Sequence, residues 1–342
     1  MANHILKPFI SEPKLTVACP PYRHCSKTVA IIMRDFLLAL IPAAVLAVAQ
    51  FGVAAARVMA LAGAVAVLTE ALCLKIMVQD VSVDDYSALL TGLLFAFLLP
   101  PSAPWWLVII GSSLSVLLGR IFFGGLGGSP LCAPLVAWAV CKISWPRAMD
   151  LDLSMLDSEL AYPLGQLKDL GPEVVSHFNY IHLLLGKQLG GLGSAQVLGI
   201  VLGALYLIMR KHIRLHIPLA FLAGMYITAW ITFLIDPTQY AGPIFHLLAG
   251  SAIYGAFFLA TDFASSPVGR IPMILFGLIA GVLAIIIRAY SVHPDGVPFA
   301  ILLANLLTPL LDRIRPQPFG GQKTGSIQLQ LKIGNGGSVD KN

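Results

Sequence analysis

A glycine-rich stretch, FFGGLGGSPLCAP, occupies Phe122–Pro134 and holds four glycines within five residues. Glycine-rich loops often cradle the phosphates of nucleotides, but in soluble enzymes such a loop follows a strand, and the P-loop ends in Lys-Ser or Lys-Thr. Here long apolar runs flank the loop, and Ser129 and Pro130 follow the glycines. We therefore predict a turn between two membrane spans, in which the glycines bring the backbone close to a ring system.

Isolated polar side chains lie within or beside the apolar runs, and each has a functional and a structural explanation. A titratable group at membrane depth is a candidate for function, whereas a group at the end of a span can reach the interface. Asp85 could equally be a carboxylate at a helix N-terminus, and Asp262 could pair with Arg270. Small residues such as Thr91 could serve helix packing. The candidates of this kind are Asp85, Ser87, Thr91, His246, Asp262, Arg288, Asp295 and Asn305.

The remaining patterns of chemically active residues argue against several classes of protein. The five cysteines form no CxxC pair, and no His/Cys cluster has zinc or iron–sulfur spacing, so we predict no metal site. No nucleophile–base–carboxylate set is visible, and no dinucleotide fingerprint follows a strand. We therefore predict neither a hydrolase nor a soluble dehydrogenase, and no catalytic residue on this chain.

The composition indicates the solvent in which these residues must be positioned. Of the 342 residues, 57% are hydrophobic and 11% are charged, and the mean hydropathy is +0.83. Soluble domains carry about 25% charged residues, so a lipid bilayer is the natural solvent for this chain. Backbone groups in lipid must be satisfied within the segment, which favours helices. We predict about ten spans, at 30–51, 56–77, 86–101, 104–122, 130–147, 193–210, 215–235, 243–262, 271–289 and 295–312.

The Lys and Arg residues predict how the spans are oriented. They gather before the first predicted span, in the turn Arg210–Arg214 and after the last span, whereas Pro100–Trp106 and Asp236–Pro243 carry none. The positive-inside rule therefore predicts that both termini are cytoplasmic, and residues 1–27 lack the pattern of a cleaved signal peptide. The net charge of +5 follows from this topology, so we expect no nucleic-acid partner.

The chain divides around a long polar break into two halves of five predicted spans each. Two sequence similarities link the halves: LLTGLLFAFLLPPSAP at Leu89–Pro104 resembles Leu247–Pro267, and GSPL at Gly128–Leu131 resembles GVPF at Gly296–Phe299. Chance similarity between Leu/Ala-rich helices is the simpler explanation, but the shared order of two matches favours a repeat. Repeats with an odd number of spans are inverted in the membrane, with binding sites on broken helices at the midplane. The expected parts are a cytoplasmic segment 1–29, a first half 30–147, an outer loop 148–192, a second half 193–316 and a disordered tail 317–342.

Several of these motifs together resemble one family. They are IMRDFLLALIP (Ile32–Pro42), DYSALLTGLLFAFLLPPSAPWW (Asp85–Trp106), FFGGLGGSP (Phe122–Pro130), HLLAGSAIYGAFFLATD (His246–Asp262) and YSVHPDGVPFAILLANLLTPLLD (Tyr290–Asp312). The chain resembles, from about Pro21 to Pro316, the D subunit of the Rnf (Rsx) electron-transport complex, which is similar to the B subunit of the sodium-pumping NADH:quinone reductase. The resemblance implies an all-α integral membrane protein of the bacterial inner membrane, with ten helices in two inverted, urea-transporter-like halves.

The resemblance also implies a function. The complex exchanges electrons between ferredoxin and NAD(H) and couples this exchange to Na⁺ or H⁺ movement. This chain would be one subunit of the translocase, beside the A, B, C, E and G subunits, and would relay electrons from the FMN of the G subunit toward cytoplasmic-side carriers. Its implied cofactors are FMN near the outer face and riboflavin among the helices.

Family members attach FMN through its phosphate to a threonine of the outer loop, and here Tyr162 stands at that position. A phenol is larger and differently placed than a threonine hydroxyl, so we expect FMN to be bound non-covalently. The resemblance puts Tyr162, Arg288, His246 and Asp295 on the FMN side, with Arg288 as a ligand of the phosphate. Two asparagines of the family's glycine-loop pattern are replaced by Ser129 and Cys132. The implied riboflavin side comprises Asp85, Ser87, Thr91, Gly124, Gly125, Gly127, Ser129, Cys132 and Asn305, and Asp262 has a possible polar or ion role.

Two other functions fit parts of the same sequence. The repeat and the broken helices alone would suit a solute channel or transporter of the same inverted-repeat fold with no redox role. A structural subunit that has lost one flavin would also fit the altered motifs. A bound flavin discriminates the electron carrier from the channel.

Overall fold

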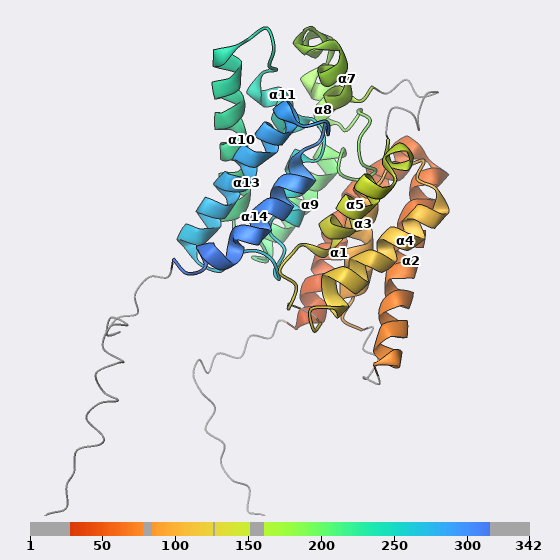
Figure 1. The fold of residues 1–342 in the computed structure, drawn as a ribbon. Coiled ribbons are helices and arrows are strands. Elements are labelled where there is room, and N and C mark those ends of the chain that lie inside the picture. The colour runs from red at the N-terminus through yellow and green to blue at the C-terminus, as the bar shows by residue number, and fades with distance from the viewer. Residues whose placement is uncertain (1–27, 78–83, 126, 151–160, 315–342) are drawn as a thin grey trace, which may run out of the picture.

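The computed structural model describes residues 28–77, 84–125, 127–150 and 161–314, and all regular elements in these ranges are helical. Most of the predicted cytoplasmic segment, the predicted tail and part of the predicted outer loop lie outside the described residues. Figure 1 shows the helices of the first half beside those of the second half, with the short helices α7 and α8 at one end of the molecule. The start of α1 and the end of α14 lie at the opposite end.

The first half contains five apolar helices. Their bounds are α1 (Val29–Phe51), α2 (Val53–Ile76), α3 (Ser87–Ala96), α4 (Trp105–Val116, continued by a π-helical turn at Leu117–Ile121) and α5 (Ala133–Ser144). A short 3₁₀ turn at Pro146–Met149, the helices α7 (Pro163–Leu170) and α8 (Tyr180–Leu184), and a 3₁₀ turn at Pro172–His177 follow.

The second half begins with α9 (Val197–Met209) and α10 (His216–Ile235). It continues through α11 (Pro243–Leu248), α12 (Ala252–Tyr254) and a π-helical turn at Gly255–Leu259, and it ends with α13 (Arg270–Tyr290) and α14 (Val297–Leu311). The sequence predicts one span over 243–262, and the structure breaks this span after Leu248. The helix that follows Asp85, α3, starts at Ser87.

Four helices, α1, α2, α10 and α13, are long and apolar enough to cross a membrane by length and composition. Five shorter apolar helices lie at the predicted positions of other spans: α3, α4, α5, α9 and α14. Large apolar side chains are exposed on the long helices, among them Val53, Ile76 and Ile235. Exposed apolar surface of this kind suits contact with lipid.

Small residues bring the helices into close contact in both halves. A Cβ added to Gly203 of α9 would clash with the Ala39 carbonyl oxygen of α1, and one added to Gly281 of α13 would clash with the Phe221 carbonyl oxygen of α10. Backbones that approach so closely leave no room for a side chain, as is common between helices in lipid. The glycines of these helices therefore have a packing role.

Candidate functional site

The break between α11 and α12 is the first feature that positions polar groups. Gly250 has φ +70°, a left-handed conformation that suits glycine. An added Cβ there would lie 2.5 Å from Leu164 Cδ1 and 3.2 Å from Asp295 Oδ2, so other segments press closely on the break. His246 lies within α11, three residues after its start at Pro243.

Arg288 of α13 satisfies backbone oxygens that the break leaves without helical partners. Its Nη1 donates to the His246 carbonyl at 2.6 Å, and its Nη2 donates to the Ala249 carbonyl at 3.1 Å. Nη2 also pairs with Asp295 Oδ1 at 3.1 Å, and the Arg288 side chain is 2% exposed. Asp295 Oδ2 accepts hydrogen bonds from the backbone N–H and the hydroxyl of Ser251. The predicted FMN-side residues Arg288, His246 and Asp295 therefore form one network.

Gln188 completes this network from a third segment of the chain. Its buried side chain donates through Nε2 to the Leu248 carbonyl at 3.1 Å and to the Ala195 carbonyl at 3.2 Å, and its Oε1 accepts from Gly250 N–H at 3.4 Å. Buried backbone groups without partners are costly, and more so in lipid. Sequence reasoning missed Gln188, and its one signal was an uncharged amide among small and apolar residues.

A cavity of about 360 Å³ lies beside this break, and we call it the Tyr162 cavity. Tyr162 and Asp295 of the predicted FMN side line it, together with Trp138 and His293. Its charged lining residues are Lys142, Arg147, Lys168, Asp150, Asp169 and Asp295. A second cavity of about 380 Å³, the His246 cavity, shares Lys168 and Pro294 with the first and is lined by His246 and Arg288.

Aromatic rings and positive charges lie on one side of the Tyr162 cavity. The His293 ring stacks on Phe299 with centroids 4.9 Å apart, and Phe299 packs edge-on against Trp138 at 5.1 Å. Partial burial lowers the pKa of His293, and the charges of Lys142 and Lys168 lower it further. Partial burial likewise lowers the pKa of Lys168, against the opposing effect of Asp169. The surroundings of His293 therefore disfavour an additional positive charge.

The predicted riboflavin-side residues gather around a smaller space, the Cys132 cavity, of about 80 Å³. Its lining includes Ser87, Thr91, Gly125, Gly127, Ser129, Cys132 and Asp262. A neighbouring cavity of about 210 Å³ shares Met33, Gly127, Asp262 and Ala264 with it. Residues from α3, the glycine loop, the start of α5 and the segment after the second π turn thus meet at one place.

The remaining candidates of this group have identifiable local roles. Asp85 Oδ1 accepts from the backbone N–H and the hydroxyl of Ser87, which supports the helix-terminus explanation. Thr91 donates to the Ser87 carbonyl, and Asp262 Oδ2 accepts from the Ser265 hydroxyl at 3.0 Å.

The glycine loop turns through left-handed backbone at Gly124, Gly125 and Gly127, with φ of +87°, +107° and +87°. Gly125 and Gly127 line the Cys132 cavity, whereas Gly124 lies outside its lining. Asn305 is buried in α14, also outside that lining, and neither atom of its amide has a hydrogen-bond partner among the described residues.

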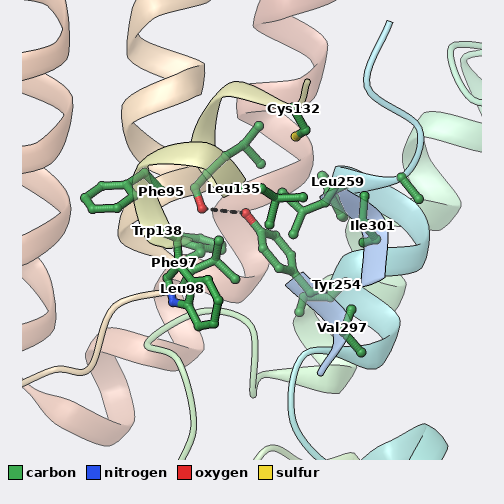
Figure 2. Close-up of a cluster of buried hydrophobic side chains, with 14 of the residues drawn as sticks. Phe95, Phe97, Leu98, Cys132, Leu135, Trp138, Tyr254, Leu259, Val297 and Ile301 are labelled. Carbon is green, nitrogen blue, oxygen red and sulfur yellow. Dashed lines mark hydrogen bonds between the residues drawn. The ribbon is translucent and has the colours of Figure 1, made fainter. Parts of the chain in front are cut away.

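An apolar wall separates the Tyr162 cavity from the Cys132 cavity. Figure 2 shows Tyr254 within this wall, between Cys132 on one side and Leu98 and Trp138 on the other. The buried Tyr254 hydroxyl donates to the Leu94 carbonyl at 2.9 Å. Leu94 lines the Cys132 cavity, and Leu98 lines the Tyr162 cavity, so the end of α3 borders both.

A buried charged cluster near the start of α1 was not among the predicted site residues. Asp35 is 1% exposed, and its Oδ2 lies 2.7 Å from His212 Nε2 and 3.1 Å from Arg210 Nε. The Tyr206 hydroxyl approaches Asp35 Oδ1 at 3.4 Å. The sequence signal was an aspartate inside the first predicted span, and Arg210 had served only to predict topology. This cluster joins α1 to the turn between α9 and α10.

Comparison with known proteins covers nearly the whole chain. The model of the NQR2, RnfD, RnfE family matches residues 16–320. The chain is 35% identical over 326 residues to the D subunit of the proton-translocating ferredoxin:NAD(+) oxidoreductase complex of Clostridium ljungdahlii, and the match covers 92% of this chain and 98% of that protein.

Two further relatives are similar to the same extent. The D subunit of the Na(+)-translocating ferredoxin:NAD(+) oxidoreductase complex of Acetobacterium woodii is 34% identical, over 91% of this chain and 97% of that protein. The D subunit of the ion-translocating oxidoreductase complex of Alcanivorax borkumensis is 34% identical, over 90% and 97%. With these matches, the chain belongs to the NQR2, RnfD, RnfE family.

Proposed function

We propose that this chain is the flavin-carrying D subunit, in the membrane, of an Rnf-type ion-translocating ferredoxin:NAD(+) oxidoreductase. The observation that carries the proposal is the identity of about one third across at least 90% of the chain to three D subunits. The names of two relatives differ in the ion, Na⁺ or H⁺, so we assign no coupling ion. The proposed partners are the A, B, C, E and G subunits, and indirectly ferredoxin and NAD(H).

We further propose ten spans in two inverted halves. Corresponding helices pack in corresponding ways, since the second helix of each half contacts the third and fourth, α2 with α3 and α4, and α10 with α11 and α13. The last helices of the two halves, α5 and α14, meet through Trp138 and Phe299. These parallels support a repeat, because unrelated helical bundles have no reason to share a packing order.

The proposed location is the bacterial inner membrane, with both termini in the cytoplasm. The basic turn Arg210–Arg214 joins the start of α1 through Asp35, and Arg214 Nη1 donates to the Val268 carbonyl near the end of α14. Basic residues near span ends favour the cytoplasmic side. The Tyr162 cavity would then open toward the outer face and the Cys132 cavity toward the inner one.

For FMN, the Tyr162 cavity has a suitable size and lining. Small-molecule sites usually measure about 300–1,000 Å³ and combine apolar walls with a few polar groups. The cavity of about 360 Å³ supplies Trp138 and His293 beside the ring and cations for a phosphate. Tyr162 is 7% exposed and packs with Leu164 and Phe245, so its phenol is poorly presented for a phosphate ester. This burial supports non-covalent binding.

For riboflavin, the Cys132 cavity has suitable polar groups and insufficient room. At about 80 Å³ it is well below the usual size of a small-molecule site, and the neighbouring cavity of about 210 Å³ is below it as well. Riboflavin there requires the two spaces to merge, with Ser129, Cys132 and Ser87 beside the ring.

A bound flavin would supply the redox chemistry that the amino-acid side chains lack. The chain's own contribution is positional. Arg288, Asp295 and Gln188 hold the broken helix beside the Tyr162 cavity, and the apolar wall around Tyr254 keeps water out of the space between the two cavities.

The visible spectrum of the purified complex tests this proposal. Flavin absorbance at one or more flavins per chain supports it, whereas a colourless, folded protein that moves a solute into vesicles would establish the channel function instead. Flavin fluorescence of the denatured band on a gel tests the mode of attachment. We expect no fluorescent band from the natural chain, and Tyr162→Thr should produce one when the flavin-attaching enzyme is present.

A further inference from the structure

The Arg288 guanidinium binds the carbonyls of the helix break, and these bonds limit its ability to bind a flavin phosphate. Both of its terminal nitrogens donate to protein oxygens, two carbonyls and the Asp295 carboxylate. These bonds use three of its five N–H groups, including both on Nη2, and the buried Nε has no hydrogen-bond partner within the described part of the chain. A two-pronged contact with a phosphate needs a hydrogen of Nη2, so it would take the donor from the Ala249 carbonyl or from Asp295. Other cations must meet the phosphate.

Three other cations line the Tyr162 cavity from three separate elements. Lys142 lies in the last turn of α5, Arg147 in the 3₁₀ turn that follows, and Lys168 in α7. Lys142 Nζ already donates to the Met149 carbonyl at 2.9 Å, which holds its ammonium group near the cavity wall. Lys142 has a further interaction besides this bond.

The acidic residues of the cavity do not cancel these cations on the His293 side. Asp295 is paired with Arg288 and Ser251, and Asp169 lines the cavity next to Lys168. Asp150 also lines the cavity and has a partner of its own. Burial is the main cause of the lowered pKa of His293, and the charges of Lys142 and Lys168 lower it further, so both cations act at the His293 ring and make the potential there more positive. A positive potential beside a stacked aromatic surface suits a ligand with a ring and an anionic group.

We propose that Lys142 and Lys168, with Arg147 at the rim, form a phosphate-binding subsite of the Tyr162 cavity, which holds the phosphate of non-covalently bound flavin mononucleotide. This inference rests on the proposed function. Charge-assisted hydrogen bonds from cations of different elements would replace the ester bond that Tyr162 cannot make. The binding step forms no covalent bond and transfers no electron.

The experiment compares two flavins that differ by the phosphate alone. The full chain is purified within its complex, depleted of flavin, and titrated with FMN and with riboflavin while flavin fluorescence is recorded. The variants are Lys168→Met, Arg147→Met and Lys142→Gln, and Lys187→Met serves as the control because Lys187 is exposed and lies outside the cavity lining. Thermal unfolding identifies any variant that has lost its fold, and Lys168→Met, on an exposed position of α7, keeps the test usable if Lys142→Gln unfolds.

We expect the natural chain to bind FMN at least about tenfold more tightly than riboflavin, because two charge-assisted contacts are at stake. Lys168→Met should weaken FMN binding about tenfold, raised salt should weaken it as well, and riboflavin binding should stay unchanged. Equal affinity for both flavins, or variants that weaken both equally, would overturn the subsite and leave the proposed function standing. Absence of binding of either flavin would overturn the proposed function and the subsite together.

Discussion

The two ends of the molecule each carry a buried charged network with cavities nearby, and the networks and cavities of the two ends differ. At the Tyr162 end, Arg288, Asp295 and Gln188 satisfy the backbone of a broken helix beside a cavity of about 360 Å³. At the other end, Asp35, His212 and Arg210 join α1 to a turn, and the nearby Cys132 cavity measures about 80 Å³. The resemblance implies a cofactor at both ends, but the space for one differs between the ends.

Removal of Arg288 tests the network at the Tyr162 end and should have the largest effect. Arg288→Met should lower the free energy of unfolding by about 3–5 kcal/mol, because it leaves the partly buried Asp295 and two carbonyls without their donor. Arg270→Met is the matched control, since Arg270 is exposed at the other end of the same helix, and it should cost less than about 0.5 kcal/mol. Unfolding of the purified chain in denaturing detergent measures both. Equal losses in the two variants would contradict the role assigned to the break.

Removal of Asp35 tests the network at the opposite end. Asp35→Asn should lower the free energy of unfolding by about 1.5–3 kcal/mol, because bonds to a charged acceptor are lost from His212 and Arg210. Arg210→Met should cost about 1 kcal/mol or less, because the Arg210 side chain is 50% exposed. The same unfolding assay applies. A larger loss for Arg210→Met than for Asp35→Asn would show that Arg210, and not the buried carboxylate, holds the turn.

The glycine loop offers a finer test of the Cys132 cavity. Gly125→Ala should cost about 1–2 kcal/mol, because Gly125 has φ +107° and a side chain there is strained. Gly242→Ala is the control, since Gly242 has extended backbone and open space around its added Cβ, and its effect should stay within about 0.5 kcal/mol. If the two variants are equally stable, the loop is free to adopt another backbone and the cavity can enlarge for a ring.

The smallest expected effect is a pH dependence from His293. Its pKa in the folded chain is lowered, so below the ordinary value of about 6.5 the unfolded chain takes up the proton first. The stabilisation is therefore present above about pH 6.5 and is lost as pH falls toward the folded pKa. His293→Asn should flatten this part of the stability profile. A histidine resonance that titrates above the ordinary range would contradict the positive potential, whereas bound phosphate should raise this pKa.

The sequence predicted the positions of the apolar helices, and the riboflavin side that the resemblance implies stays a prediction. Apolar runs are local signals, and Ser87, Thr91, Ser129, Cys132 and Asp262 belong to motifs that the resemblance treats as one site. The number of spans and their inversion stay predictions, as do the two flavins. Local signals could not reveal that Gln188 and Arg288 bind the break between α11 and α12, because their contacts with the break join residues 39 to 62 positions apart.

The similar stretches LLTG (Leu89–Gly92) and LLAG (Leu247–Gly250) illustrate this limit. Gly92 lies inside a continuous α3, where an added Cβ would meet the Ala62 carbonyl oxygen of α2, whereas Gly250 stands at a break. The residues that permit the break, Arg288 and Asp295, lie far along the chain from it. The sequence similarity therefore predicted that the two stretches occupy equivalent places in the two halves. It did not predict that one is a continuous helix and the other is broken.

The broken helix also has a consequence for the order in which the chain is made. The carbonyls of His246 and Ala249 and the N–H of Ser251 find their partners in Arg288 and Asp295, which are synthesised about forty residues later. The segment that holds them is therefore made before its polar groups can be satisfied. A chain cut short between residues 251 and 288 would keep these backbone groups and lack both side chains that satisfy them.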